Sequence, residues 1–413
     1  MGALRSPFPA AALRRQTHAP SARRAYVPAH RSDGLAVDLK PLAGLETSDW
    51  NRWRELADCA LQPNVFYEPA FARAAANLPW SRGVGALLVR SGSRLIGALA
   101  GRVEGPLQGR PIPTFVAWAH PYAPLSTPLL DREAAETAVA ALLHDLPLLP
   151  GAPRVALFPL IDEDGPVARL LADHLYRRMR PLHRLDAHAR AALVLAGGDP
   201  LASVPAKKLK ELGRQRRRLA ELGALDRVSI GGEGIEAAVS TFLELEASGW
   251  KGRIGGAAAA HPETARFLAE AVAGLAREGK ARVDLITLDR KPLAATIALF
   301  SGDRAWFWKT AYDERYAHFS PGVLGALALT EDLGRDQHIA RVDSCAIAHH
   351  PMIDHLWSGR QAMADWLVAL SGSVPFRIEL AAERLRRTAY HSLKALRDRL
   401  RGPIRHGPAA AGG

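Results

Sequence analysis

The sequence predicts an α+β protein built from two tandem copies of one unit, each a mixed sheet flanked by helices. Residues 303–345 read as strand, loop, helix and strand. Directly before this stretch, residues 285–302 (LITLDRKPLAATIALFSG) align with residues 87–101 (LLVRSGSRLIGALAG). Both segments read as strand, basic turn and strand. Such an internal duplication favours two copies of one fold side by side. Residues 194–204 (VLAGGDPLASV) form the predicted linker between the copies.

The first copy begins at Leu35, where the composition becomes that of a folded chain. Periodicity and turn residues predict helices at 49–60 and 131–143, a hairpin at 84–90 and 95–102 closed by Ser91-Gly92-Ser93, and a strand at 114–119. Two aromatic residues, Phe66 and Tyr67, stand in a loop after the first helix. They either line a cleft or anchor the loop in the core.

The second copy follows the same order of elements. The sequence predicts helices at 207–222, 235–246 and 261–278, strands at 281–288, 305–310 and 340–345, a polar loop at 312–319 and a helix that starts at Ser320. After Pro375 the chain turns basic, and residues 377–401 have helical spacing. That last helix has three interpretations: it packs on the domain, binds a partner, or lies on an anionic membrane surface.

Composition limits the class of protein. The 413 residues are 48% hydrophobic and 23% charged, enough for two domains of roughly 150 to 200 residues. No apolar run approaches the roughly 20 residues that cross a bilayer. The two cysteines, Cys59 and Cys345, are too few for a disulfide framework and lack zinc-site spacing. We therefore expect a cytoplasmic protein with no metal.

The net charge of +12 and the pI of about 10.1 favour polyanionic neighbours. Candidates are CoA phosphates, nucleotide sugars, RNA and an anionic membrane face. Residues 1–34 contain no acidic residue before Asp33, and we expect this basic segment to be disordered. An organellar transit peptide and an N-myristoylation motif at Met1-Gly2 with Ser6 are the alternatives.

The start of the helix at Ser320 offers a site for an anion. Ser320 stands at the N-cap, Pro321 at the first helical position, and Gly322 and Gly325 in the first turn, so backbone amides lie open at the positive end of the helix. Together with Val323, these residues are the predicted binding site for a phosphate or another anion. The segment reads SPGVLG in place of the R/QxxGxG/A phosphate loop.

The segment WKTAYDERYAHFSPG (residues 308–322), followed by VDSCA (residues 342–346), resembles the GCN5-related N-acetyltransferases (GNAT). Within that superfamily it is similar to the CelD/BcsL group, acetyltransferases of cellulose biosynthesis, and more distantly to the FemABX aminoacyltransferases. The resemblance covers most of residues 35–370. It implies two GNAT-like domains, at 35–195 and 196–375, with the donor site in the second and a basic helix and flexible tail at 376–413.

Acyl transfer needs a base for the acceptor and proton donors for the carbonyl or leaving group. The resemblance places Asp343 at the strand end that opens toward the acyl carbonyl, where its neighbours Val342 and Ser344 favour a raised pKa. A structural cap for the next loop is the alternative role of Asp343. Tyr312 and Tyr316 lie at the other lip of the cleft as candidate proton donors.

Substrate contacts are predicted from basic and aromatic residues. Trp250 and Lys251 occupy a Gly-rich loop where the CelD/BcsL group has a Trp-Lys pair, and Lys309 stands among aromatic residues as a cation–π partner or anion ligand. The helix at 207–222 carries Arg214 and Arg217 in the densest basic cluster, either an anion site or a solvated face. His349 is expected on the cleft floor, or with its neighbours at a helix end near Met352.

The combined prediction is an acyltransferase that uses acetyl-CoA or another acyl-CoA to modify a hydroxyl or amine on a sugar or polysaccharide precursor. One alternative is a FemABX-like transferase whose donor is aminoacyl-tRNA. Another is a non-catalytic accessory protein of a polysaccharide synthase, held through the C-terminal basic helix. The sequence lacks an HExxH motif and a nucleophile elbow, which argues against a hydrolase.

Overall fold

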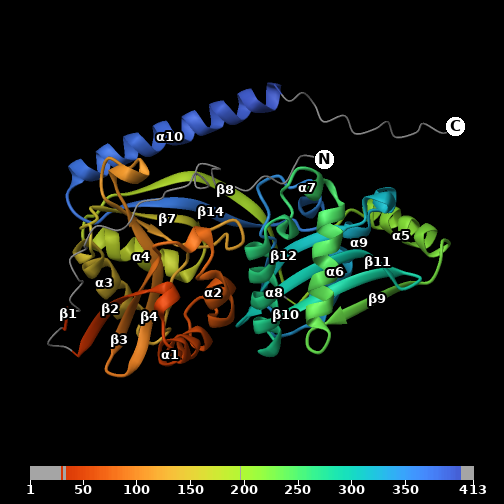
Figure 1. Ribbon diagram of the computed structural model, residues 1–413, viewed down its shortest axis with the longest axis horizontal. Coiled ribbons are helices and arrows are strands. Elements are labelled where there is room, and N and C mark those ends of the chain that lie inside the picture. Colours follow the sequence, from red (N-terminus) through yellow and green to blue (C-terminus); the bar gives the residue numbers. More distant parts are fainter. Residues whose placement is uncertain (1–28, 31–33, 196, 401–413) are drawn as a thin grey trace.

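A computed structural model describes residues 29–30, 34–195 and 197–400 of the chain (Figure 1). Within these residues the strands join one continuous sheet of 14 strands, which crosses both halves of the molecule. The interpretations of residues 1–28, including the transit-peptide and myristoylation alternatives, lie outside the described residues, as does the tail after residue 400.

The strands follow the chain from one edge of the sheet to the centre and then return to the centre from the other edge. Their order in space is β1-β2-β3-β4-β5-β7-β14-β8-β13-β12-β11-β10-β9, with β6 paired to β4. Their bounds are Ala29–His30 (β1), Leu35–Pro41 (β2), Gly85–Ser91 (β3), Arg94–Glu104 (β4), Thr114–Ala117 (β5), Leu129–Leu130 (β6), Val155–Asp162 (β7), Leu182–Val194 (β8), Leu225–Ile230 (β9), Ala281–Leu288 (β10), Lys291–Ser301 (β11), Arg304–Tyr312 (β12), Arg341–Asp343 (β13) and Gly359–Ala369 (β14).

Helices cover both faces of this sheet. Their bounds are Thr47–Asp58 (α1), Pro69–Ala75 (α2), Ala135–Asp145 (α3), Pro166–Arg177 (α4), Ala206–Ala220 (α5), Ile235–Ser248 (α6), Trp250–Arg253 (α7), Pro262–Arg277 (α8), Pro321–Arg335 (α9) and Ser373–Leu400 (α10). On one face, α1, α2, α6 and α8 share a single apolar core that joins the two halves. On the other face, α3 and α4 cover the first half, and α5 and α9 cover the second.

The two halves exchange strands at the centre of the sheet. β14, the last strand along the chain, pairs with β7 of the first half on one side and with β8 on the other. Each half also contains one parallel pair at an equivalent place, β5 with β7 and β12 with β13. The halves are therefore two copies of one plan, as the internal duplication predicts, but they share one hydrogen-bonded sheet.

Local predictions agree with most of these elements. The hairpin at β3 and β4 closes through Gly92 in a left-handed turn (φ 59°), and the duplicated hairpin is β10 and β11. Phe66 and Tyr67 are fully buried, so they anchor their loop. The prediction of a helix at 131–143 was wrong at its start, because the buried carboxylate of Asp131 instead pairs with Arg94 and α3 begins at Ala135.

Candidate functional site

The sheet opens where β12 leaves β13. β12 pairs with β11 along its whole length, from Arg304 to Tyr312, but it pairs with β13 only from Arg304 to Trp306. Beyond Asp343 the chain turns toward β8, where the amide of Ser344 donates to the carbonyl of Ala191. The edge of β12 after Trp306 thus has no strand partner on that side. A ligand in this opening lies beside the carboxyl ends of two parallel strands.

A bulge in β12 brings Lys309 to this opening. The register between β11 and β12 shifts at Ile297/Ala298, which leaves Trp308 as the extra residue of β12. The ammonium nitrogen of Lys309 lies over the ring of Tyr122, 4.2 Å from its centroid, and 5.9 Å from that of Trp308. Burial, with the nearby charge of Lys251, lowers the pKa of Lys309 to about 8. The neutral amine is therefore more accessible near neutral pH than in an exposed lysine.

An ion pair between Lys251 and Glu246 lies beside Lys309 on this side of the opening. The ammonium group of Lys251 donates to Glu246 Oε1 at 2.6 Å, and the amide of Ala258 donates to Glu246 Oε2 at 2.8 Å. Burial alone would raise the pKa of Glu246, but Lys251 and Lys309 hold this pKa below its usual value. Glu246 is consequently ionised, and it is poorly suited to accept a proton near neutral pH.

Asp343 forms a buried ion pair at the base of the opening. Its carboxylate accepts from the guanidinium of Arg190, and its Oδ1 also accepts from the amide of Cys345 at 2.9 Å. Arg190 donates further to the carbonyl of Pro124 at 3.1 Å. Burial and the adjacent Asp343 raise the pKa of the Cys345 thiol. The bond to Cys345 corresponds to the loop-capping alternative, and the role of Asp343 as base stays a prediction.

The N-terminus of α9 lies on the other face of the opening. Ser320 precedes the helix in a left-handed conformation (φ 54°), and its side chain makes no capping hydrogen bond. Gly322 and Gly325 face the sheet: a Cβ at Gly322 would lie 3.2 Å from Tyr312 Cδ1, and one at Gly325 would lie 3.3 Å from Thr296 Oγ1. These glycines therefore let α9 approach β11 and β12 closely. Pro321 and Val323 occupy the same turn, and anion binding there stays a prediction.

The two tyrosines assigned as proton donors differ in position. Tyr312 ends β12, so it belongs to the strand and not to the predicted loop, because it still pairs with Ala294 of β11. Burial and the nearby Glu314 raise the pKa of Tyr312, which keeps its hydroxyl protonated. Tyr316 lies in the 3-10 segment Glu314–Phe319 and packs against the core under α9.

Glu314 links α7 to the segment Glu314–Phe319 through two hydrogen bonds. Its Oε1 accepts from the amide of Trp250 and its Oε2 from the guanidinium of Arg253, both at 2.7 Å. These bonds hold Trp250 and Lys251 beside the segment Glu314–Phe319, and Lys251 and Glu246 in turn lie near Lys309. α5 also packs on the segment Glu314–Phe319.

The remaining predicted contacts lie farther out. Arg214 and Arg217 are exposed on α5, at the surface next to that segment. His349 is exposed in a left-handed turn (φ 57°), whereas its neighbour His350 accepts the amide of Met352 at 3.2 Å. His350 therefore caps the short helical turn near Met352, one of the two roles foreseen for these histidines.

Three residues of the site escaped sequence reasoning: Tyr122, Glu246 and Arg190. Tyr122 had a signal, since its loop HPYAPLST is the counterpart in the first half of the loop before α9. Glu246 stands five residues before Lys251 but reads as an ordinary helix residue. Arg190 carries no local signal, because its partner Asp343 is 153 positions away.

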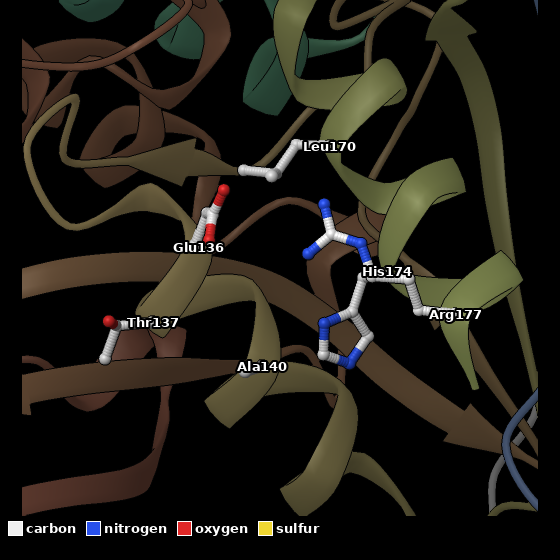
Figure 2. Close-up of a pocket in the computed structure, with 6 residues that line it drawn as sticks. All are labelled: Glu136, Thr137, Ala140, Leu170, His174 and Arg177. Carbon is white, nitrogen blue, oxygen red and sulfur yellow. The ribbon is translucent and has the colours of Figure 1, made fainter.

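Two hollows elsewhere do not belong to this site. One, of about 270 Å³, lies between α3 and α4 on the outer surface, where Glu136, His174 and Arg177 line it (Figure 2). The other, of about 600 Å³, lies at the ends of β2 to β5 in the first half. Within the described residues, no group of three or more His, Cys, Asp and Glu side chains is placed to hold a metal ion.

Residues 206–350 match the family model described as an acetyltransferase (GNAT) domain, so the second half of the chain carries an acyltransferase domain of this type. Among curated protein sequences, none matches this chain.

Two solved structures share the fold, and a third matches less well. FemX is 10% identical with a TM-score of 0.51, and the alignment covers 79% of this chain and 96% of FemX. A conserved protein of unknown function from Bacteroides thetaiotaomicron is 11% identical, also with a TM-score of 0.51, over 81% of this chain and 100% of that one. The C-terminal domain of a putative lysylphosphatidylglycerol synthetase from Agrobacterium fabrum is 13% identical with a TM-score of 0.48, over 82% and 96%.

Proposed function

We propose that the C-terminal half transfers an acyl group from acetyl-CoA or another acyl-CoA to a hydroxyl or amine of a sugar or polysaccharide precursor. The observation that carries this proposal is the position of Lys309. It stands at the unpaired edge of β12, between the aromatic ring of Tyr122 and the ion pair of Glu246 with Lys251. A partly neutral amine thus faces the place where donor and acceptor meet.

The donor fits the side of the opening that α9 covers. An acyl-thioester arm can bond to the free edge of β12, as a neighbouring strand would, and this places its carbonyl near residue 308. Its phosphates would then reach the start of α9 and the exposed Arg214 and Arg217 of α5. α5, which carries these two arginines, contacts the segment Glu314–Phe319.

The chemistry follows from the protonation states. The acceptor oxygen or nitrogen attacks the thioester carbonyl carbon, the carbon–sulfur bond breaks, and the sulfur leaves as a thiolate. Neutral Lys309 takes the proton that the acceptor loses, and the protonated hydroxyl of Tyr312 supplies one to the sulfur. Asp343 is the alternative base, although it must then give up its pairing with Arg190.

The acceptor side is suited to a sugar. The half-buried Tyr122 offers an aromatic ring, and Lys251 with Glu246 offers paired donors and acceptors, the combination that contacts the faces and hydroxyls of a pyranose. A link to cellulose or exopolysaccharide synthesis rests on the CelD/BcsL resemblance at Trp250-Lys251 and residues 308–322. A non-catalytic accessory role would require that this cluster does no chemistry.

A second donor is favoured by one specific observation. Most basic residues of α5 are exposed, α5 contacts the segment Glu314–Phe319 before α9, and such a basic helix also suits the phosphates of RNA. Aminoacyl-tRNA is therefore the alternative donor, and its aminoacyl ester would occupy the same opening as the thioester.

The test combines binding with turnover. Calorimetry of the full chain against acetyl-CoA, longer acyl-CoAs and aminoacyl-tRNA identifies the donor, and acyl transfer to nucleotide sugars and amino sugars is then followed by release of free thiol. We expect Lys309→Met to lower kcat by roughly 10² to 10⁴ with donor affinity nearly unchanged. Lys291→Met, at an exposed lysine of the β10–β11 turn, is the matched control. Full activity of folded Lys309→Met would overturn the assignment.

A further inference from the structure

α10 carries an apolar stripe along its outer face. Its members are large hydrophobic side chains with exposed fractions from 46% to 71%, namely Val374, Ile378, Leu385, Leu393 and Leu396. At about 100° per residue these positions fall within an arc of roughly 100°, so they form one continuous face. In Figure 1 the helix runs along the outside of the molecule, and its C-terminal part slants away from the sheet.

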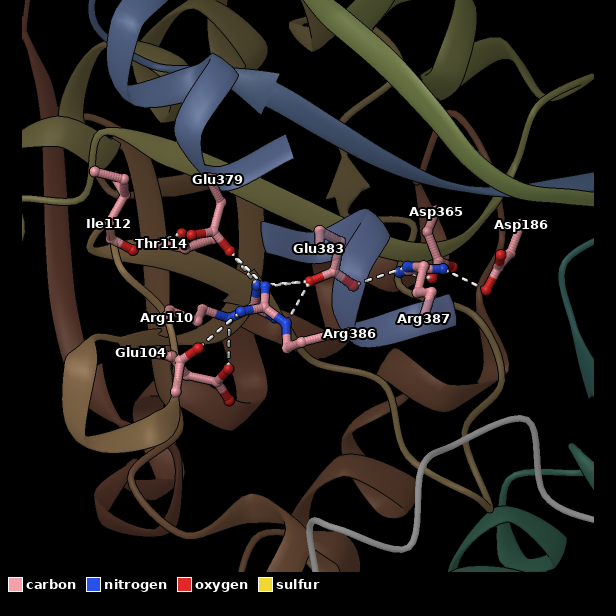
Figure 3. A network of polar contacts seen from close by, with 11 residues as sticks. Glu104, Arg110, Ile112, Thr114, Asp186, Asp365, Glu379, Glu383, Arg386 and Arg387 are labelled. Carbon is pink, nitrogen blue, oxygen red and sulfur yellow. Dashed lines mark hydrogen bonds and ion pairs between the residues drawn. The ribbon is translucent and has the colours of Figure 1, made fainter. Parts of the chain in front are cut away.

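The opposite face of α10 holds the helix in this orientation. Phe376 and Leu380 pack on β7, β8 and β14, and Glu379 and Glu383 are buried. Both carboxylates accept from Arg110 of the first half, at 2.7 and 3.1 Å (Figure 3). This buried anchor prevents the helix from rotating, so its leucines cannot turn inward to reach the core.

The same anchor leaves the outer surface cationic. Glu379 and Glu383 are the carboxylates of residues 373–397. Both pair with Arg110 and Arg386, and Glu383 also pairs with Arg387. Arg377 and Arg384 are exposed along one flank of the stripe. Within residues 373–397, the part of α10 whose side chains are described, an apolar stripe lies beside exposed arginines without outward carboxylates, which is the pattern of a helix that lies in an anionic interface.

We propose that α10 is a membrane-contacting surface that lays its leucine stripe into an anionic phospholipid bilayer. A helix of 28 residues is about 42 Å long, and it would lie parallel to the membrane plane. Within the described part of the chain, no helix is long and apolar enough to span a bilayer. A second copy of the chain is the less favoured occupant, because two cationic helix faces would repel each other.

The experiment is sedimentation of the full chain with sucrose-loaded vesicles. We expect binding to vesicles of phosphatidylcholine with 30% phosphatidylglycerol, and little binding to phosphatidylcholine alone. Leu385→Gln/Leu393→Gln/Leu396→Gln should weaken this binding at least 100-fold, because three apolar side chains leave the interface. Arg377→Gln/Arg384→Gln should weaken it roughly 10- to 30-fold, at about one tenfold step or less per charge.

The control removes exposed apolar side chains from the second half of the chain. Leu222, which follows α5, and Val228, which lies in β9, are 54% and 45% exposed, and their double glutamine variant should bind vesicles as the parent chain does. Vesicle binding that survives the leucine replacements overturns the proposal. The proposal is also overturned if the chain forms a dimer without lipid and the leucine replacements dissociate that dimer. The same holds if the chain binds an acidic protein and does not bind vesicles.

Discussion

The ion pair of Asp343 with Arg190 allows the structural role of Asp343 to be tested apart from its catalytic role. The side chains are 6% and 2% exposed, so Asp343→Asn leaves a guanidinium buried without its counter-charge. Removing one partner of such a pair costs about 3 to 5 kcal/mol. The bond from the amide of Cys345 survives, since the carbonyl oxygen of asparagine still accepts it.

The melting temperature gives the size of the effect. Because both halves share one sheet, the chain unfolds as one unit, with an unfolding entropy of roughly 0.8 kcal/mol per kelvin at about 2 cal/mol/K per residue. The expected loss for Asp343→Asn is therefore about 4 to 6 °C by scanning calorimetry. Turnover is measured on the same variant below its melting range.

The matched control is Asp336→Asn. Asp336 is exposed and accepts the amide of His338 at 2.9 Å, the same turn geometry as Asp343 with Cys345 but without an arginine. It should melt within about 1 °C of the parent, since asparagine is an equivalent cap. If Asp343→Asn melts like the parent and loses roughly 10² to 10⁴ in turnover, the structural interpretation is refuted and Asp343 is the base.

Three further predictions test the opening. Because burial lowers the pKa of Lys309 from 10.5 to about 8, the unfolded chain holds more protons between these values, so stability relative to Lys309→Met should rise with pH across pH 8 to 10.5 in urea unfolding. Gly322→Val should weaken acyl-CoA binding and lower the free energy of unfolding by about 1 to 3 kcal/mol, because the new side chain meets Tyr312. Gly213→Ala, where a Cβ has free space, should change neither quantity, and unchanged donor affinity of Gly322→Val would remove this turn from the donor site. For an aminoacyl-tRNA donor, log K should fall by roughly 0.7 per phosphate neutralised as log salt rises, and no tRNA affinity at low salt rejects that donor.

Local patterns predicted the elements around the site. The strand at residues 281–288 agrees with β10, because its boundaries follow from the flanking turn residues Gly279 and Asp289. The proline after Ser320 marked the start of α9 for a similar reason, since proline suits the first helical position. These features depend on neighbours within a few residues, and the sequence displays those neighbours directly.

Long-range pairing could not be predicted in this way. The insertion of β14 between β7 and β8 joins segments that are far apart, and hydrophobic periodicity does not state which strands become neighbours. The same limit hid Arg190 beside Asp343 and Tyr122 beside Lys309. Gly322 shows a subtler limit: a glycine in a first turn suggests open amides, but here its missing side chain makes room for Tyr312.

The place of β14 has a consequence for how the chain is made. β7 emerges from the ribosome with one edge unpaired, and its partner β14 is translated roughly 200 residues later, about 10 to 40 s at ordinary elongation rates. The first half must wait for that strand, and an open strand edge is prone to pair with other chains. Slow translation or an early stop before residue 359 should therefore yield aggregates rather than a folded first half. A fragment limited to residues 206–350 would likewise lack both central strands, β8 and β14.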